Sequence, residues 1–263
     1  MVIRRENTIR RRLADGGVAL GGVVQTGSPE AVEMMGHAGY DFVLIDTEHG
    51  TIDLGMLVHM IRAADAVGLS SMVRVPDHTP SHILRVLDAG AAGILAPHLR
   101  SAAEAQALVR AVKFAPVGER GACPSTRATG HLTRDWAAFV REANRDTLVW
   151  GLIEDRDGVE AIDEIVAVDG LDGLMFGPFD LAQALGLPGA VTHMQVDALR
   201  ERVRLAAQAR GVQLISLSVW EPGGMTGAKA RGARVVIEGS DRALLSAGFR
   251  RVCDELSAVF RSS

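Results

Sequence analysis

Eight short apolar segments, each separated from the next by a stretch with helical signals, constrain the fold of this chain more than any other feature. Each segment has the length of a buried strand rather than of a helix. The predicted strands are Val18–Val24, Asp41–Ile45, Ser70–Val75, Gly93–Ala96, Thr147–Ile153, Gly173–Phe176, Gln213–Val219 and Ala233–Ile237. Parallel neighbours need a crossover helix, so the alternation predicts a parallel sheet. Eight such units favour a closed (β/α)8 barrel over an open doubly wound sheet.

Start and stop signals support the intervening helices. Ser28 before Pro29 places an N-cap ahead of a proline at the first helical position, and Asp53 and Gly68 are typical of a helix start and stop. Further helices are predicted from Pro80 to Leu87, Ser101 to Lys113, Asp135 to Asn144, Gly158 to Val166, Met194 to Ala209, Pro222 to Arg231 and Asp241 to Phe260, and the arginine-rich start is predicted to form a surface helix. The 263 residues contain no interior linker or tandem repeat, so we expect one barrel domain over residues 1–263.

Composition narrows the classes of function. The net charge of -4 gives no electrostatic reason to expect nucleic acid or an anionic membrane as a partner. The basic start lacks the apolar segment of a signal peptide, and no stretch approaches the roughly 20 apolar residues that span a bilayer. We therefore expect a cytoplasmic protein. Cys123 and Cys253 are expected to be free thiols, and the irregular segment Ala115–Arg134 is long enough to suggest a functional or mobile loop.

The stretch Leu44–Gly50 (LIDTEHG) ends an apolar strand with three ionisable side chains, Asp46, Glu48 and His49. Charged groups are costly inside a core, so this cluster is expected at the rim where the strand emerges into a cleft. The alternative is a polar turn that leads into the helix starting near Asp53, with His49 as a cap.

Four more ionisable side chains stand at or just after predicted strand ends, namely Arg74, His98, Glu154 and Asp180. Two carboxylates from separate strands suit a divalent cation, because magnesium takes few carboxylates and leaves positions for water and substrate oxygens. We therefore predict Glu154 and Asp180 as metal ligands. In the alternative, Glu154 pairs with Arg156 at the surface and Asp180 caps a helix beginning at Leu181.

Arg74 and His49 are the other candidates for chemistry. A guanidinium fixed at a barrel mouth would bind a carboxylate or stabilise an enolate oxygen, although Arg74 is equally suited to a salt bridge with Asp46 or Glu48. His49 suits a general base near neutral pH, provided that a carboxylate orients its other nitrogen. Asp88 is a candidate for that carboxylate, with a surface role as the alternative.

The run from Phe176 to Leu181 (FGPFDL) combines a glycine turn with a helix start, so its free backbone N–H groups suit an anion. Both lysines of the chain, Lys113 and Lys229, fall on predicted helices, and neither is placed to form a Schiff base. Chemistry through an enolate would therefore need a metal as the electron sink. The sequence has no dinucleotide-binding or Walker motif.

The chain resembles the HpcH/HpaI aldolase family of metal-dependent pyruvate aldolases over almost its whole length, from about Ala19 to Phe260. The segments that carry the resemblance are SPEAVEMMGHAGYDFVLIDTEHG, VRVP around Arg74, RVLDAGAAGILAPHL, PVGERG, IED and FGPFDLA. The resemblance implies a (β/α)8 barrel in a homo-oligomer, a hexamer built as a trimer of dimers that exchange their last helix. It also implies a divalent metal cofactor, Mg²⁺ or Mn²⁺, with Co²⁺ as a third candidate.

The resemblance further implies reversible retro-aldol cleavage of a 4-hydroxy-2-oxo acid to an aldehyde and pyruvate, or a related 2-oxo acid, through a metal-bound enolate. Glu154 and Asp180 match the metal ligands, Arg74 matches the arginine that steadies the enolate oxygen, and His49 with Asp88 matches a proton-transferring pair. The backbone of Gly177, Phe179 and Asp180 matches the seat of the substrate carboxylate.

Some positions depart from the family pattern. Val23 stands where some members carry tryptophan, Leu152 where many carry glutamine, and Asp155 where threonine is usual. These departures leave two alternatives to the aldolase. One is an enolate synthase of the same family, which performs a citrate-forming condensation or a decarboxylative C–C bond formation from oxaloacetate. The other is a non-catalytic barrel that binds 2-oxo acids.

Overall fold

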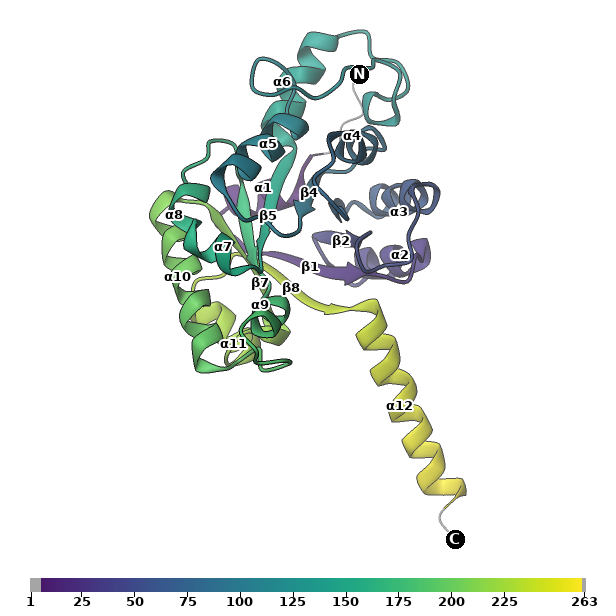
Figure 1. The fold of residues 1–263 in the computed structure, drawn as a ribbon. Helices are drawn as coiled ribbons and strands as arrows, with labels where there is room; N and C mark the ends of the chain where they lie inside the picture. The colour runs from purple at the N-terminus through teal and green to yellow at the C-terminus, as the bar shows by residue number, and fades with distance from the viewer. Residues whose placement is uncertain (1–5, 262–263) are drawn as a thin grey trace.

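The computed structural model describes residues 6–261, and its centre is a closed barrel of eight parallel strands in sequence order, with β8 pairing back to β1 (Figure 1). The strands are β1 (Ala19–Val24), β2 (Phe42–Asp46), β3 (Ser70–Arg74), β4 (Gly93–Ala96), β5 (Leu148–Ile153), β6 (Gly173–Phe176), β7 (Gln213–Leu217) and β8 (Val235–Ser240). The predicted closed barrel is therefore confirmed.

Helices lie before, between and after the strands. They are α1 (Thr8–Ala14), α2 (Pro29–His37), α3 (Leu54–Val67), α4 (Pro80–Asp88), α5 (Ala102–Val112), η1 (Arg127–Thr129), α6 (Trp136–Asp146), α7 (Arg156–Glu160), α8 (Ile162–Ile165), α9 (Pro178–Ala184), α10 (Met194–Arg210), η2 (Ser218–Trp220), α11 (Gly224–Ala230) and α12 (Asp241–Phe260). The sequence signals act locally as expected: the side chains of Ser28 and Asp53 cap α2 and α3, and Gly68 takes the left-handed conformation that ends α3. The single helix predicted from Gly158 to Val166 is instead two short helices, α7 and α8.

Two hydrophobic layers hold the barrel together. The strand faces that point inward form one core, in which Phe42 and Trp150 meet edge to face with their ring centroids 5.8 Å apart. The outward faces pack against the helices in a second and larger core that includes Ile45, Met60 and Ile94. Because both faces of most of the strands are buried, their sequences are continuous apolar runs and do not alternate between apolar and polar residues.

Helix α1 closes the N-terminal end of the barrel. Ile9 is fully buried in the inner core, and the hydroxyl of Thr8 donates to the carbonyl of Asp41 at 2.5 Å and lies 2.8 Å from the hydroxyl of Ser70. Both partners stand where strands begin. The arginine-rich start was predicted as a surface helix, and that prediction was wrong in part, because one face of α1 covers the barrel floor. The opposite end, where the strands finish, is the open mouth.

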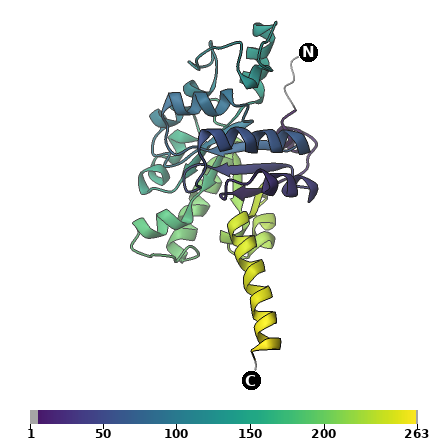
Figure 2. The same ribbon diagram turned by 90° about the vertical axis from the view of Figure 1, so that its right-hand side faces the viewer.

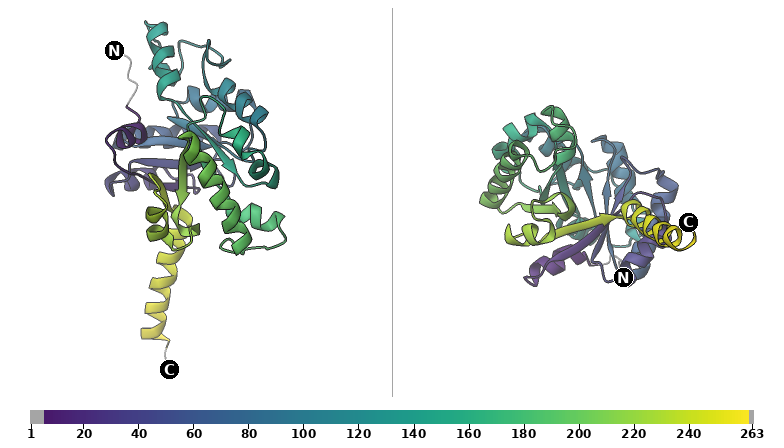
Figure 3. Two further views of the ribbon diagram at one scale, coloured as in Figure 1. Left: turned by 90° about the vertical axis from the view of Figure 1, so that its left-hand side faces the viewer. Right: turned by 90° about the horizontal axis from the view of Figure 1, so that it is seen from below.

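Helix α12 leaves the barrel at its first turn and extends away from it (Figures 1 and 2, and the left panel of Figure 3). Asp241 is its only buried residue, and it accepts hydrogen bonds from the N–H groups of Gln25 and Thr26 at 3.0 Å. The outer face of β1 lacks a covering helix at Leu20, whose side chain is 49% exposed. No helix among residues 6–261 is long and apolar enough to cross a lipid bilayer.

Candidate functional site

The polar side chains predicted at the strand ends gather at the mouth of the barrel. Asp46 is the last residue of β2 and Arg74 the last of β3, and these two residues are register partners. Glu154 follows β5 directly, and Asp180 lies in the first turn of α9, which follows β6. Because all strands are parallel, their carboxyl ends share one face of the barrel, which brings residues far apart in sequence to one site.

Arg74 and Asp46 form a two-point ion pair. The Nε of Arg74 donates to Oδ1 of Asp46 at 2.9 Å, and its Nη2 donates to Oδ2 at 2.5 Å. Asp46 is fully buried, and Nε2 of Gln25 donates to its Oδ2 at 2.7 Å. Burial alone would raise the pKa of Asp46, but the hydrogen bonds and charge of Arg74 hold it below its ordinary value. The carboxylate is therefore ionised, and it fixes the plane of the guanidinium. The salt bridge considered from the sequence is present.

Glu48 and His49 continue from β2 into the mouth. Oε2 of Glu48 is buried without a hydrogen-bond partner and lies 3.2 Å from Nε of Arg74. His49 is more open, with 63% of its side chain exposed and its Nε2 3.9 Å from that same oxygen. Both backbone N–H groups donate to Oδ1 of Asp46, so the turn itself is held by the buried carboxylate.

Glu154 is buried in an unusually acidic environment. Burial raises its pKa to about 7, and the negative charges of Asp180 and Glu48 add to the effect, while His98 opposes it. The backbone N–H of His98 donates to Oε1 of Glu154 at 2.9 Å. The alternative surface pairing with Arg156 is not formed, because Nη2 of Arg156 donates to the carbonyl of Ala184.

The alternative considered from the sequence was a helix that begins at Leu181. In the structure α9 begins three residues earlier, at Pro178. The first intrahelical hydrogen bond runs from the N–H of Leu181 to the carbonyl of Gly177, so the N–H groups of Phe179 and Asp180 precede it. A Cβ at Gly177 would lie 2.7 Å from Cβ and 2.8 Å from Oε2 of Glu154. Glycine is therefore required at this position, because any side chain would displace the buried carboxylate.

Asp88 lies at the other end of the barrel from His49. It ends α4, which runs from the mouth back to the floor, and its Oδ1 accepts a hydrogen bond from Nη2 of Arg120 at 2.8 Å. Within residues 6–261, Asp88 forms its ion pair with Arg120 and no hydrogen bond or ion pair with His49. The predicted His49–Asp88 pair is thus not brought together within one chain.

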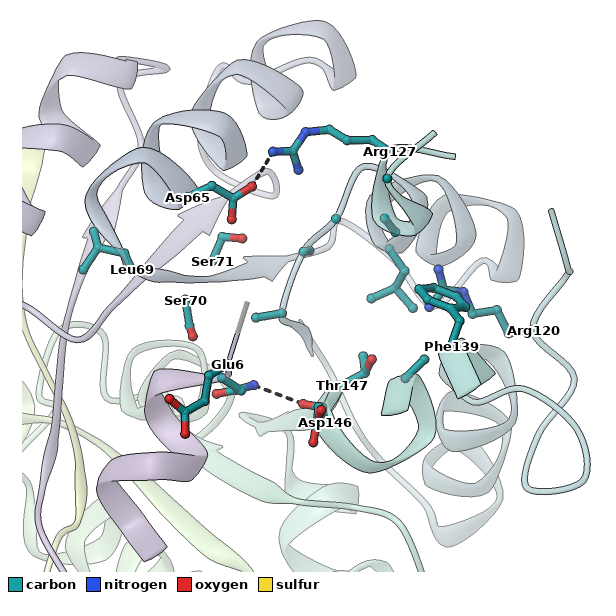
Figure 4. Close-up of a pocket in the computed structure, with 18 of the residues that line it drawn as sticks. Glu6, Asp65, Leu69, Ser70, Ser71, Arg120, Arg127, Phe139, Asp146 and Thr147 are labelled. Carbon is teal, nitrogen blue, oxygen red and sulfur yellow. Dashed lines mark hydrogen bonds and ion pairs between the residues drawn. The ribbon is translucent and has the colours of Figure 1, made fainter. Parts of the chain in front are cut away.

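The segment Ala115–Arg134 is also at the floor, because it follows α5 and precedes α6, which leads to the start of β5. It contains η1, and Arg127 of that turn donates to the carbonyl of Ala89 at 2.9 Å and pairs with Asp65 at the end of α3. With the starts of β3 and β5 it lines a cavity of about 310 Å³ (Figure 4). None of the acidic side chains at the mouth lines this cavity.

Sequence reasoning missed some residues that the structure places at the mouth. Gln25 stands one position after β1, and its contact with Asp46 had no sequence signal. His98 had been noted as a strand-end residue and Asp155 as a departure from the family pattern, yet neither had received a role. The structure joins these two residues, with Nδ1 of His98 3.0 Å from Oδ2 of Asp155.

Comparisons with known proteins agree with this geometry. The model of the HpcH/HpaI aldolase/citrate lyase family matches residues 23–247. A hydroxypyruvate/pyruvate aldolase of Roseovarius nubinhibens is 37% identical over 211 residues, which cover 78% of this chain and 81% of the relative. The solved structure of an HpcH/HpaI aldolase from Desulfitobacterium hafniense DCB-2 is similar with a TM-score of 0.88 and 31% identity, covering 94% of this chain and 96% of that one. The structure of the citrate synthase SbnG is similar with a TM-score of 0.85 and 31% identity, covering 96% and 97% of the two chains. The chain therefore belongs to the HpcH/HpaI aldolase/citrate lyase family and is an aldolase, a carbon–carbon lyase.

Proposed function

We propose that this protein is a metal-dependent aldolase that reversibly cleaves a 4-hydroxy-2-oxo acid to an aldehyde and pyruvate or a related 2-oxo acid. The relative from Roseovarius nubinhibens, with its name of hydroxypyruvate/pyruvate aldolase, supports a substrate of this class. The single observation that carries the proposal is the concentration of negative charge around Glu154, where Asp180 and Glu48 both disfavour its ionised form. A cation at this place would relieve that repulsion.

The donor set suits a hard divalent cation such as Mg²⁺ or Mn²⁺, with Co²⁺ as a further candidate. Glu154 and Asp180 would hold it, and within residues 6–261 there is no cluster of three or more His, Cys, Asp or Glu side chains arranged as ligands. Two protein carboxylates leave the other positions to water and to the substrate's carboxylate and keto oxygens, as is common for Mg²⁺. The buried Oε2 of Glu48, which has no hydrogen-bond partner and lies 3.2 Å from Nε of Arg74, adds negative charge near Glu154. When bound, the cation supplies positive charge that stabilises the enolate oxygen.

The protein's own side chains would then act on the substrate from fixed positions. Arg74 is held by Asp46 and would direct its guanidinium at the oxygen on which charge develops during C–C cleavage, at little reorganisation cost. The N–H groups of Phe179 and Asp180 would bind the substrate carboxylate. His49, exposed at the mouth, would exchange a proton with the substrate 4-hydroxyl, directly or through water.

An Asp88 that orients His49 would have to come from a second subunit, because the two residues of one chain stand at opposite ends of the barrel. The proposed homo-oligomer, a hexamer built as a trimer of dimers, would allow this. The segment Ala115–Arg134 at the floor of one barrel would then reach the mouth of the barrel in a neighbouring subunit and not the mouth of its own barrel.

The shape of α12 supports exchange of this helix between two subunits. Its exposed apolar side chains are Leu244, Leu245, Phe249, Val252, Leu256, Val259 and Phe260. An isolated amphipathic helix of this kind needs a partner to cover its apolar side. The uncovered outer face of β1, with Leu20 exposed, is a surface that the last helix of a (β/α)8 barrel would normally cover. A second copy of the chain could supply that helix.

A synthase that uses the same enolate is the second candidate. It is favoured by the similarity to the structure of the citrate synthase SbnG and by Leu152, a buried apolar side chain that departs from the glutamine of the family pattern. A non-catalytic 2-oxo-acid-binding barrel would have no need of a proton-transferring group such as His49 at its mouth.

The deciding experiment is exchange of the pyruvate methyl protons with deuterium, followed by NMR with Mn²⁺ or Mg²⁺ and with EDTA. We expect exchange that depends on the metal and is lost in Glu154→Gln and Asp180→Asn. Glu164→Gln is the matched control, because that side chain is exposed on α8. Exchange that persists in EDTA, or in both ligand variants, would refute the proposal. A panel of aldehydes and oxaloacetate then separates the aldolase from the synthase.

A further inference from the structure

His98 has an unusual backbone that serves the buried carboxylate next to it. Its φ is 50°, in the left-handed region that few residues other than glycine adopt. In this conformation its backbone N–H donates to Oε1 of Glu154 at 2.9 Å. The ring Nδ1 lies 3.4 Å from the same oxygen and 3.0 Å from Oδ2 of Asp155. A single backbone turn thus directs two polar atoms of His98 at two neighbouring carboxylates.

Asp155 is held on its other side by Arg100. Nε of Arg100 lies 3.0 Å from Oδ2 of Asp155, and Nη2 donates to Oδ1 at 3.3 Å. Oδ2 of Asp155 is therefore the nearer acceptor for Nδ1 of His98, at 3.0 Å against 3.4 Å for Oε1 of Glu154.

The two oxygens of Glu154 have different surroundings. Oε1 accepts the hydrogen bond from His98, whereas Oε2 faces the space that the missing side chain of Gly177 leaves open. Gly177 is also the N-cap of α9, the helix that carries Asp180 in its first turn. The free oxygen of Glu154 therefore lies on the side of the second acidic residue.

We propose that Arg100, Asp155 and His98 form a positioning chain that holds Oε1 of Glu154, so that Oε2 alone binds the divalent cation shared with Asp180. This inference rests on the proposed function. Asp155 keeps the Nδ1–H group of His98 away from Glu154. Without Asp155, that donor would turn to Glu154, 3.4 Å away, and compete with the cation for the same carboxylate.

Outer-shell partners of metal ligands commonly change affinity by about 10- to 100-fold. We therefore expect Asp155→Asn to raise the Kd for Mn²⁺ by about tenfold or more, measured by electron paramagnetic resonance of free Mn²⁺. Asp157→Asn is the matched control, since it removes the same charge at an exposed position of α7 two residues away, and it should change the Kd by less than about twofold. At saturating Mn²⁺, kcat of Asp155→Asn should return to within a few-fold of wild type, because Asp155 does not touch the substrate.

A double-mutant cycle tests whether Asp155 acts through His98. His98→Asn is the suitable partner, because asparagine tolerates the left-handed backbone and keeps the N–H group directed at Glu154. In the His98→Asn background, Asp155→Asn should have no further effect on the Kd. Arg100→Gln, at a half-exposed side chain, should raise the Kd in the same direction by a smaller factor and serves if Asp155→Asn folds poorly.

Equal Kd values for Asp155→Asn and Asp157→Asn would overturn the inference, as would an undiminished effect of Asp155→Asn without the His98 ring. These results would leave the proposed function standing if Glu154→Gln still abolishes Mn²⁺ binding. Mn²⁺ binding that is the same in wild type and Glu154→Gln would overturn both.

Discussion

Arg74 and Asp46 meet in a fork-to-carboxylate ion pair at the ends of adjacent strands, and the carboxylate is completely buried. Removing one partner of a buried pair leaves a charge without compensation, which is far more costly than the pair's net contribution to stability. Arg74 therefore has a role in the fold in addition to the role in catalysis that we propose for it.

Arg74→Ala should lower the free energy of unfolding by about 3–5 kcal/mol, because Asp46 keeps its charge in a buried place. Urea unfolding measures this loss. The double variant Asp46→Asn, Arg74→Ala should regain much of the stability and none of the C–C cleavage activity. Recovery of turnover in the double variant would show that the guanidinium takes no part in the reaction.

The contribution of Glu154 to the stability of the metal-free protein should fall as pH rises from about 4.5 to above 7. The folded-state pKa of Glu154, about 7, exceeds its ordinary value, so the folded state binds more protons than the unfolded state in this window. Ionisation of Glu154 therefore costs folding free energy, on the order of 1–3 kcal/mol across the window. The difference in stability between wild type and Glu154→Gln, measured in EDTA, should follow this trend.

Saturating Mn²⁺ should remove that pH dependence at its upper end, because the cation takes the place of the proton. A stability difference between wild type and Glu154→Gln that stays constant from pH 5 to pH 8 in EDTA would contradict the raised pKa.

Gly177→Ala should weaken Mn²⁺ binding by tenfold or more, because the new methyl group would stand 2.8 Å from Oε2 of Glu154. Isothermal titration with Mn²⁺ measures the effect. Gly55→Ala, in the first turn of α3, is the control: its Cβ meets only an Asp53 oxygen at 3.2 Å. Equal affinity in the two variants would place the cation away from Oε2.

Leu245→Glu with Phe249→Glu should shift the protein toward smaller assemblies, because two charges on the apolar side of α12 oppose burial against another copy. Both side chains are exposed in the single chain, 49% and 71%, so the barrel itself should lose little stability. Size-exclusion chromatography with light scattering reports the mass. Arg251→Glu, at another exposed α12 position, controls for charge alone. An unchanged mass in the double variant would exclude α12 as an assembly element.

The barrel and most strand-end residues were predictable because their signals are local. A buried strand needs an unbroken apolar run, a helix needs a cap such as Ser28 or Asp53, and parallel strands need helices between them. With the order of strands established, the positions of Arg74 and Glu154 at one mouth follow from strand direction alone.

The ion pairs and hydrogen bonds between side chains at the barrel mouth could not be predicted, because they depend on distances between residues remote in sequence. The sequence left Arg74 as either a free cation or an ion-pair partner. Only the register between β2 and β3 shows that Arg74 pairs with Asp46. It suggested Asp88 beside His49, yet the direction of α4 carries Asp88 to the floor. The raised pKa of Glu154 required knowledge of its burial and of Asp180 and Glu48 around it.

The sequence by itself determined the closed barrel and the set of ionisable groups at its mouth, since hydrophobic period and helix caps act over a few residues. Only the tertiary structure decided which of those groups are paired and which are buried. It also decided that His98 adopts a left-handed backbone and donates its N–H group to Glu154. Those properties arise from desolvation and Coulomb interactions, which depend on three-dimensional distance and not on position along the chain.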